Sequence, residues 1–219
     1  MGAQAEVIAA VAAGDKDRLQ GLLAKDPKLA AARDRNGVSA VMQALYTRHP
    51  ELLKPLLAAE PGLDVFEATA LGRSERVAEL LKNDTSLATS FSPDGFTALH
   101  FACFFGQEAT GRILLAHGAD PAAVASNPMK VMPLHSAASA RNLGLAAALL
   151  ERGAPVNARQ AMGWAPLHAA AQNGDKAMAE LLLKHGADPR ATNDEGVSAL
   201  ELAKTGGHGE LLGLLENSA

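Results

Sequence analysis

The sequence predicts an all-α fold, a solenoid in which short helix-turn-helix units stack one upon the next. The first observation is an internal repeat. A leucine recurs at steps of 35, 33 and 33 residues, at Leu99, Leu134, Leu167 and Leu200. The second observation is composition, since 48% of the residues are hydrophobic, mostly Ala and Leu, and only 4% are aromatic. Ala and Leu suit close-packed helices, whereas a β-rich chain would carry more Val, Ile, Tyr and Thr.

Length, charge and cysteine content narrow the function classes. A chain of 219 residues holds one or two domains. The net charge of −4 argues against a nucleic-acid partner, which requires a basic surface. A single cysteine, Cys103, excludes an intramolecular disulfide framework and a zinc site built on several thiolates. The N-terminus has no signal-peptide pattern and no apolar run approaches the ~18 residues of a membrane span, so we expect a cytoplasmic protein without a membrane partner.

The first helix of each unit begins at a repeated tetrapeptide. Its four copies are Thr97-Ala98-Leu99-His100, Met132-Pro133-Leu134-His135, Ala165-Pro166-Leu167-His168 and Ser198-Ala199-Leu200-Glu201. Thr97 and Ser198 are suited to cap the helix, because a side-chain oxygen can accept a free backbone N–H there. Pro133 and Pro166 stand in the first turn, where the missing N–H has no cost. Each helix is expected to end close to a glycine, at Gly106, Gly174 and Gly207.

The second helix of each unit carries a run of leucines and ends at a glycine. The runs are Ile113-Leu114-Leu115, Leu149-Leu150 and Leu181-Leu182-Leu183, and the glycines that follow them are Gly118, Gly153 and Gly186. Glycine at this point accepts the positive φ of a helix C-cap. A hairpin loop then leads to the next unit, which completes a repeat of about 33 residues.

These residues closely resemble the ankyrin repeat, whose signature reads T-P-L-H-x-A-A, followed by a glycine and later by G-A-D. The match is specific from about residue 92 to 216, where the tetrapeptides and glycines recur in order. It is weaker upstream, where Val65 and Gly72 stand 34 residues before Leu99 and Gly106. The same frame also accommodates Val7, Gly14 and Val41. The resemblance implies an ankyrin-repeat solenoid.

The N-terminal region contains two copies of a two-repeat block. The pattern Leu22-Leu23…Asp26…Leu29-Ala30…Asn36-Gly37 returns 58 residues later as Leu80-Leu81…Asp84…Leu87-Ala88…Asp94-Gly95. The step from Val41 to Val65 is only 24 residues, so one hairpin loop is expected to be missing around residues 60–62. We therefore predict a single ankyrin-repeat domain over residues 1–219. Its approximate repeats, about seven in number, are 3–33, 34–60, 61–91, 92–126, 127–159, 160–192 and 193–219.

Stacked repeats present a concave surface made of hairpin tips and first helices. The resemblance implies that partner contacts come from the tips and from two positions late in the first helix. Most of the few aromatic residues fall on these positions, and an exposed apolar cluster with Trp or Tyr is typical of a binding site. For Phe104 and Phe105, packing against the next repeat is an equal alternative. The predicted partner-binding residues are Tyr46, Phe96, Phe104, Phe105, Met129, Met162, Trp164, Gln172 and Asn173.

The histidines and the cysteine are interpreted as structural. His100, His135 and His168 recur once per repeat, a spacing too wide for ligands of one metal ion. The resemblance implies that each ring hydrogen-bonds loop backbone across the repeat. Cys103 takes the second alanine position of the signature, where a free cysteine acts as a small buried hydrophobe rather than as a nucleophile. The sequence also has no glycine-rich phosphate loop.

The sequence therefore predicts a protein-interaction module rather than an enzyme. We expect a monomer that binds a protein partner through its concave face and hairpin tips, without a catalytic residue, a cofactor or a metal ion. One alternative is a small-molecule or enzymatic site in the same groove, which would require convergent polar groups in a closed pocket. Another alternative is a structural spacer. Fold-level analogy does not identify the partner.

Overall fold

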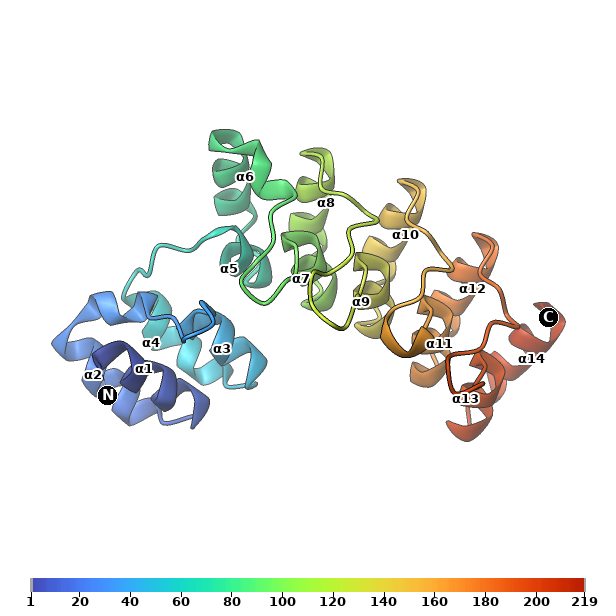
Figure 1. The fold of residues 1–219 in the computed structure, drawn as a ribbon, viewed down its shortest axis with the longest axis horizontal. Helices are drawn as coiled ribbons and strands as arrows, with labels where there is room; N and C mark the ends of the chain where they lie inside the picture. Colours follow the sequence, from blue (N-terminus) through green and yellow to red (C-terminus); the bar gives the residue numbers. More distant parts are fainter. Residues whose placement is uncertain (1, 219) are drawn as a thin grey trace. The chain divides into compact units, whose positions relative to one another are not determined.

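The computed structural model describes residues 2–218, in which helices alternate with loops and isolated β-bridges (Figure 1). Internal contacts divide the chain into two compact units, the first ending at Ala68 and the second beginning at Thr69. The division falls within helix α5 (Val65–Ala70). Over the described range, no helix is long and apolar enough to cross a membrane.

The first unit consists of two stacked helix pairs. Its helices are α1 (Ala3–Ala12), α2 (Lys16–Lys25), α3 (Ala40–Tyr46) and α4 (Leu53–Ala58), with 3-10 helices at Pro27–Ala31 and Pro50–Leu52. Helix α1 packs against α2 and α3, and α4 packs against α2 and α3. The side chains between these helices are apolar and fully buried, among them Val7, Leu19, Val41 and Leu56. Two helix pairs thus bury each other's apolar faces, as expected for neighbouring repeats.

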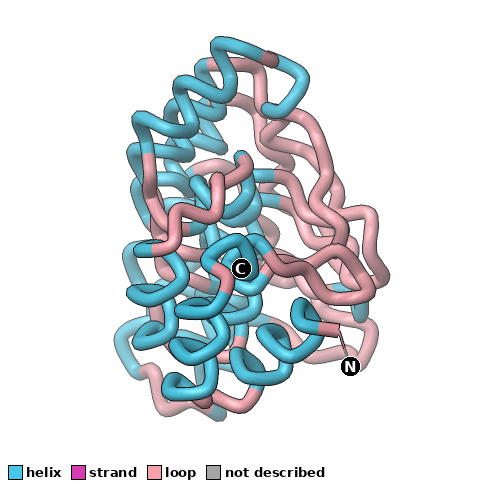
Figure 2. The backbone as a smooth tube through the Cα atoms, turned by 90° about the vertical axis from the view of Figure 1, so that its left-hand side faces the viewer, coloured by secondary structure: helices cyan, strands magenta, loops and turns pink. Residues whose placement is uncertain are grey.

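The second unit contains two rows of helices. One row is formed by α7 (Ala98–Phe104), α9 (Pro133–Ser139), α11 (Pro166–Asn173) and α13 (Ala199–Thr205). The other row is formed by α6 (Ser74–Asn83), α8 (Glu108–Ala116), α10 (Leu143–Glu151), α12 (Lys176–Lys184) and α14 (Gly209–Ser218). Each helix packs against the next one in its own row, and α7, α9, α11 and α13 pack against the helices that follow them in sequence. The loops that link successive pairs run on one side of the helices (Figure 2).

The helix ends follow the predicted punctuation. Thr97 and Ser198 are the N-cap residues of α7 and α13, and Pro133 and Pro166 occupy the first turns of α9 and α11. Gly174 ends α11 with a φ of +63°, and a Cβ atom there would lie 2.5 Å from Nδ1 of His208. Both the left-handed backbone and the close approach of that ring therefore require glycine.

The repeated leucines form the core of the second unit. Leu99, Leu134 and Leu167 expose 2% or less of their surface. Leu200, at the equivalent position of α13, is only partly buried. Within the described chain, α13 is the last helix of its row and no further repeat covers it, which explains the difference.

The two blocks predicted from the 58-residue offset adopt the same local structure. Asp26 and Asp84 share the backbone angles φ −148° and ψ 99°. Each carboxylate accepts a backbone N–H two residues later, at 3.0 Å, and each starts a 3-10 helix, at Pro27–Ala31 and at Thr85–Ala88. Equal sequence patterns therefore produce equal caps.

The hairpin loops of the second unit are joined by backbone hydrogen bonds. Ser126 N–H donates to the Gly95 carbonyl at 2.8 Å, and Ala161 N–H donates to the Met129 carbonyl at 2.9 Å. Asp194 N–H donates to the Met162 carbonyl at 3.0 Å. These bonds hold the loop tips in a row, at a fixed position above the first helices.

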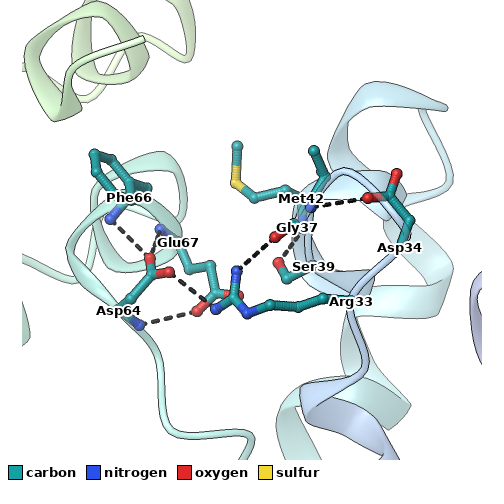
Figure 3. A network of polar contacts seen from close by, with 9 residues as sticks. Arg33, Asp34, Gly37, Ser39, Met42, Asp64, Phe66 and Glu67 are labelled. Atoms are coloured by element: carbon teal, nitrogen blue, oxygen red, sulfur yellow. Dashed lines mark hydrogen bonds and ion pairs between the residues drawn. The ribbon is translucent and has the colours of Figure 1, made fainter. Parts of the chain in front are cut away.

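The shortened repeat after α4 is bridged by a side chain. Asp64 caps α5 by accepting the N–H groups of Phe66 and Glu67, each at 2.9 Å, and Glu67 accepts the Asp64 N–H in return. Arg33, from the preceding hairpin loop, donates to Asp64 at 3.0 Å and to the Gly37 carbonyl at 3.1 Å (Figure 3). The Gly37 carbonyl thus accepts a hydrogen bond from the Arg33 guanidinium. In the loop 92–97, the corresponding carbonyl of Gly95 accepts an N–H from the next loop instead.

Glu67 is the buried member of this network, with 4% of its surface exposed. Its carboxylate lies 3.5 Å from the Arg33 guanidinium. Burial raises the pKa of Glu67, and the neighbouring Asp64 charge raises it further, against the opposing effects of Ser39, the Asp64 N–H and Arg33. The positive charge of Arg33 therefore compensates the carboxylates of Asp64 and Glu67, of which that of Glu67 is buried.

Candidate partner-binding groove

The histidine row links each repeat of the second unit to the next. The Nδ1 atoms of His100, His135 and His168 accept the N–H of the residue three positions earlier, at 3.1–3.2 Å. This leaves the proton on Nε2, which donates to loop carbonyls of the following repeat: Val131 for His100, Ala158 and Trp164 for His135, and Val197 for His168. The rings thereby fix the loops over the first helices.

Burial keeps these imidazoles neutral. It lowers the pKa of His100 to about 4, and it lowers the pKa of His135 and of His168 as well, although the bonded carbonyls act in the opposite direction. In the last repeat Glu201 replaces the histidine and turns back on its own helix, accepting the Ser198 N–H at 2.7 Å. The row of cross-repeat bonds therefore ends where the described repeats end.

Cys103 is a buried residue of α7. The Cys103 thiol is fully buried, and burial raises its pKa far above the ordinary value, so it is held as the thiol. In residues 2–218, no group of three or more His, Cys, Asp and Glu side chains is arranged to hold a metal ion.

Four of the predicted binding residues line one cavity. It has a volume of about 360 Å³ and lies between the fifth and sixth predicted repeats, over α9 and α11. We call it the α9–α11 groove. Met129 and Met162 form its rim with 55% and 59% of their surfaces exposed. The residues that line it are Met129, His135, Ser139, Gln160, Ala161, Met162, Trp164, Ala165, Ala169 and Gln172.

Trp164 is held in the groove wall by its own backbone and ring. Its carbonyl accepts the Gln160 N–H at 2.9 Å, which closes the loop, and its ring lies 5.7 Å from the His168 ring. Met162, which lies between Gln160 and Trp164 in the sequence, adopts a φ of +62°. This left-handed conformation is uncommon for residues other than glycine. Backbone strain of this kind gathers at functional sites.

The predicted phenylalanines form a separate cluster. Phe96 contacts Phe101, Phe101 contacts Phe105, and Phe105 contacts Phe104, with ring centroids 5.7, 6.3 and 5.1 Å apart. Phe96 and Phe105 are half-buried in this chain of rings, whereas Phe104 exposes 57% of its surface. None of these side chains lines the α9–α11 groove. Of the two late helix positions, Phe104 is thus the outward one.

Tyr46 and Asn173 also lie apart from the groove lining. Tyr46 belongs to the first unit, where 39% of its surface is exposed. The Asn173 side-chain amide donates to the Ser139 carbonyl at 3.1 Å. The backbone carbonyl of Asn173 accepts a bond from the Arg141 guanidinium. Its polar groups therefore join α9 to α11.

The predicted binding residues include neither Gln160 nor Ser139. The repeat frame does place Ser139 at one of the two contact positions late in the first helix, but its small polar side chain was not chosen. Gln160 precedes the loop tip and carries no signal of its own. It enters the groove because its loop folds back on Trp164.

The comparison with protein families agrees with this architecture. A family model of three ankyrin repeats matches residues 65–160 and again residues 134–218. A comparison with curated protein sequences found no significant match. Ankyrin repeats generally serve as protein–protein interaction modules, and the two matches together span well over half of the chain. The chain belongs to the ankyrin-repeat family.

Proposed function

We propose that this protein binds a partner protein through the concave face of its second unit, with the α9–α11 groove as the main contact. The observation that carries the proposal is the exposure of two methionines beside Trp164 around one cavity. Soluble proteins seldom leave contiguous apolar surface open unless it contacts something, and Trp is a frequent anchor of interfaces. Phe104, which stands one repeat earlier at the position of Ser139, offers a second exposed apolar side chain.

The same proposal includes a monomeric, non-enzymatic chain that acts in the cytoplasm as one domain of about seven repeats. The equal caps at Asp26 and Asp84 support counting repeats upstream of residue 65. The buried thiol of Cys103 and the hydrogen-bonded histidines support a role without catalysis.

The test is capture of the partner from extracts of the native cell with wild-type protein and with Trp164→Ala. We expect Trp164→Ala to lose most of the captured partner, while its thermal midpoint changes little. The matched control is Phe91→Ala, which removes a 46% exposed aromatic ring that does not line the groove. Equal capture by wild type and Trp164→Ala would contradict the proposal.

A small molecule is the second candidate for the groove. The volume of about 360 Å³ lies near the lower end of the range for ligand pockets, about 300–1,000 Å³. Thermal-shift measurements with a metabolite collection test it. A clear stabilisation that Trp164→Ala abolishes, together with no captured protein, would favour this candidate over a protein partner.

A further inference from the structure

We propose that the α9–α11 groove accepts a linear, acidic peptide segment with one apolar anchor side chain. This inference rests on the function proposed above and specifies the chemistry of the partner. It follows from three properties of the groove: an apolar wall, polar side chains that lack partners, and a surplus of positive charge.

The apolar wall defines the anchor. Met129, Met162 and Trp164 enclose a space with alanine side chains at Ala165 and Ala169. Methionine is flexible and polarizable, so two methionines can close over an aliphatic or aromatic side chain of variable shape. A cavity of about 360 Å³ has room for one large side chain and the backbone on either side of it.

The polar side chains of the lining are suited to peptide backbone. The hydroxyl of Ser139 and the amides of Gln160 and Gln172 make no hydrogen bond to any other residue of the described chain. The Met129 and Trp164 carbonyls at the rim already accept bonds from within the protein. A bound segment can therefore pair its own N–H and C=O groups with these three side chains, which both donate and accept.

The charges around the groove select acidic flanks. The charged residues within two sequence positions of a lining residue are Lys130, Arg141 and Arg159. The Asp194 backbone N–H is bonded to the Met162 carbonyl, so one carboxylate stands against these three cations. Arg159 is paired with the Asp194 carboxylate at 2.8 Å, and the Arg141 guanidinium lies on the Asn173 carbonyl. Lys130 is exposed and has no ion pair among residues 2–218. Its charge is therefore available to a carboxylate of the partner.

Charge complementarity distinguishes this occupant from its rivals. A basic peptide would meet Lys130 unfavourably. A second copy of the chain would have to present an acidic, extended segment. The wild type should therefore prefer peptides with acidic flanks, and reversal of the Lys130 charge should reverse this preference.

The experiment uses the full chain and a displayed library of random short linear peptides. Selection on the wild type is expected to enrich one apolar anchor with Asp or Glu beside it. In fluorescence polarisation, an enriched peptide should bind Trp164→Ala at least about tenfold more weakly, and Lys130→Glu about fivefold more weakly. The control Lys184→Glu changes an exposed lysine on α12, outside the groove, and should bind like the wild type.

Three results would overturn the proposal: no enriched peptide, an enriched sequence with basic flanks, or peptide binding that survives Trp164→Ala. The outcome separates it from the proposed function. If a native partner is captured in a Trp164-dependent way while no acidic peptide is enriched, the protein-binding function stands and the peptide class is wrong. If neither occurs, both are wrong.

Discussion

The guanidinium of Arg33 lies 3.0 Å from the carboxylate of Asp64, so that a hairpin-loop residue bonds the residue that caps α5. Arg159, which follows 126 residues later, stands at the equivalent position of another hairpin loop. It donates to the Thr192 carbonyl and to Asp194 of the next loop. Arginine at this position therefore joins consecutive repeats in both units. In the first unit it does so at the start of α5 (Figure 3).

Arg33→Ala is expected to weaken the first unit. The change leaves the Gly37 carbonyl without its donor and the buried Glu67 without its ion-pair partner. We expect a loss of about 1–2 kcal/mol in the free energy of unfolding. Hydrogen exchange measured at the Phe66 and Glu67 amides should accelerate, because the cap of α5 loosens. The control is Arg35→Ala, in the same loop at an exposed site. Equal exchange in the two variants would show that Arg33 does not support the cap.

The stability of the second unit is expected to fall in mild acid. In the unfolded chain a histidine takes up its proton near pH 6.5, whereas the folded chain resists protonation of His100 until about pH 4. The unfolded state thus binds more protons in this window, so the stabilisation is complete above pH 6.5 and is lost as the pH falls toward 4. The shift corresponds to about 3 kcal/mol for His100, and His135 and His168 act in the same direction.

Urea unfolding across this pH range measures the effect, with His100→Asn as the variant. It should be less stable than the wild type by about 1–3 kcal/mol at neutral pH, because the bond to the Val131 carbonyl is lost. Its stability should also depend less on pH. His185→Asn, at an exposed histidine past α12, should keep the slope of the wild type. An unchanged slope in His100→Asn would contradict the assignment of the pH dependence to the buried row.

Gln172 and Asn173 are adjacent but are expected to respond differently to substitution. Asn173→Ala removes the amide that donates to the Ser139 carbonyl, and should cost about 1 kcal/mol of stability. Gln172→Ala removes a groove-lining amide without a partner in the described chain, so it should leave the thermal melt unchanged and weaken partner capture. A large loss of stability in Gln172→Ala would mean that its side chain is structural.

Met162→Gly is expected to separate stability from binding. The left-handed φ of +62° is easily adopted by glycine, and relief of this strain offsets the greater freedom of glycine in the unfolded chain. We expect a change of less than about 1 kcal/mol in unfolding but a tenfold weaker partner, since half of the groove rim is removed. Binding at wild-type strength would show that the methionine contributes nothing to the site.

Helix positions and caps follow from local chemistry, which is why they could be predicted. Thr97, Pro133 and Gly174 act within one or two turns of their own helix, so their residue types suffice to place the helix ends. The repeat spacing then placed Met129, Met162, Trp164 and Gln172 at equivalent or adjacent positions, and these four do line one groove.

Contacts between repeats were decided only by the tertiary structure. The outward ring of Phe104 and the half-buried ring of Phe105 differ because the Phe96–Phe101–Phe105 stack covers one and not the other. Asn173 is engaged by α9, and Arg33 by Asp64, across 34 and 31 residues of chain. The periodic leucines, prolines and glycines determined an all-α ankyrin-repeat solenoid, because the prolines and glycines set the ends of their own helices and the leucines recur once per repeat. Which side chains stay free for a partner depends on the neighbouring repeat that packs beside them.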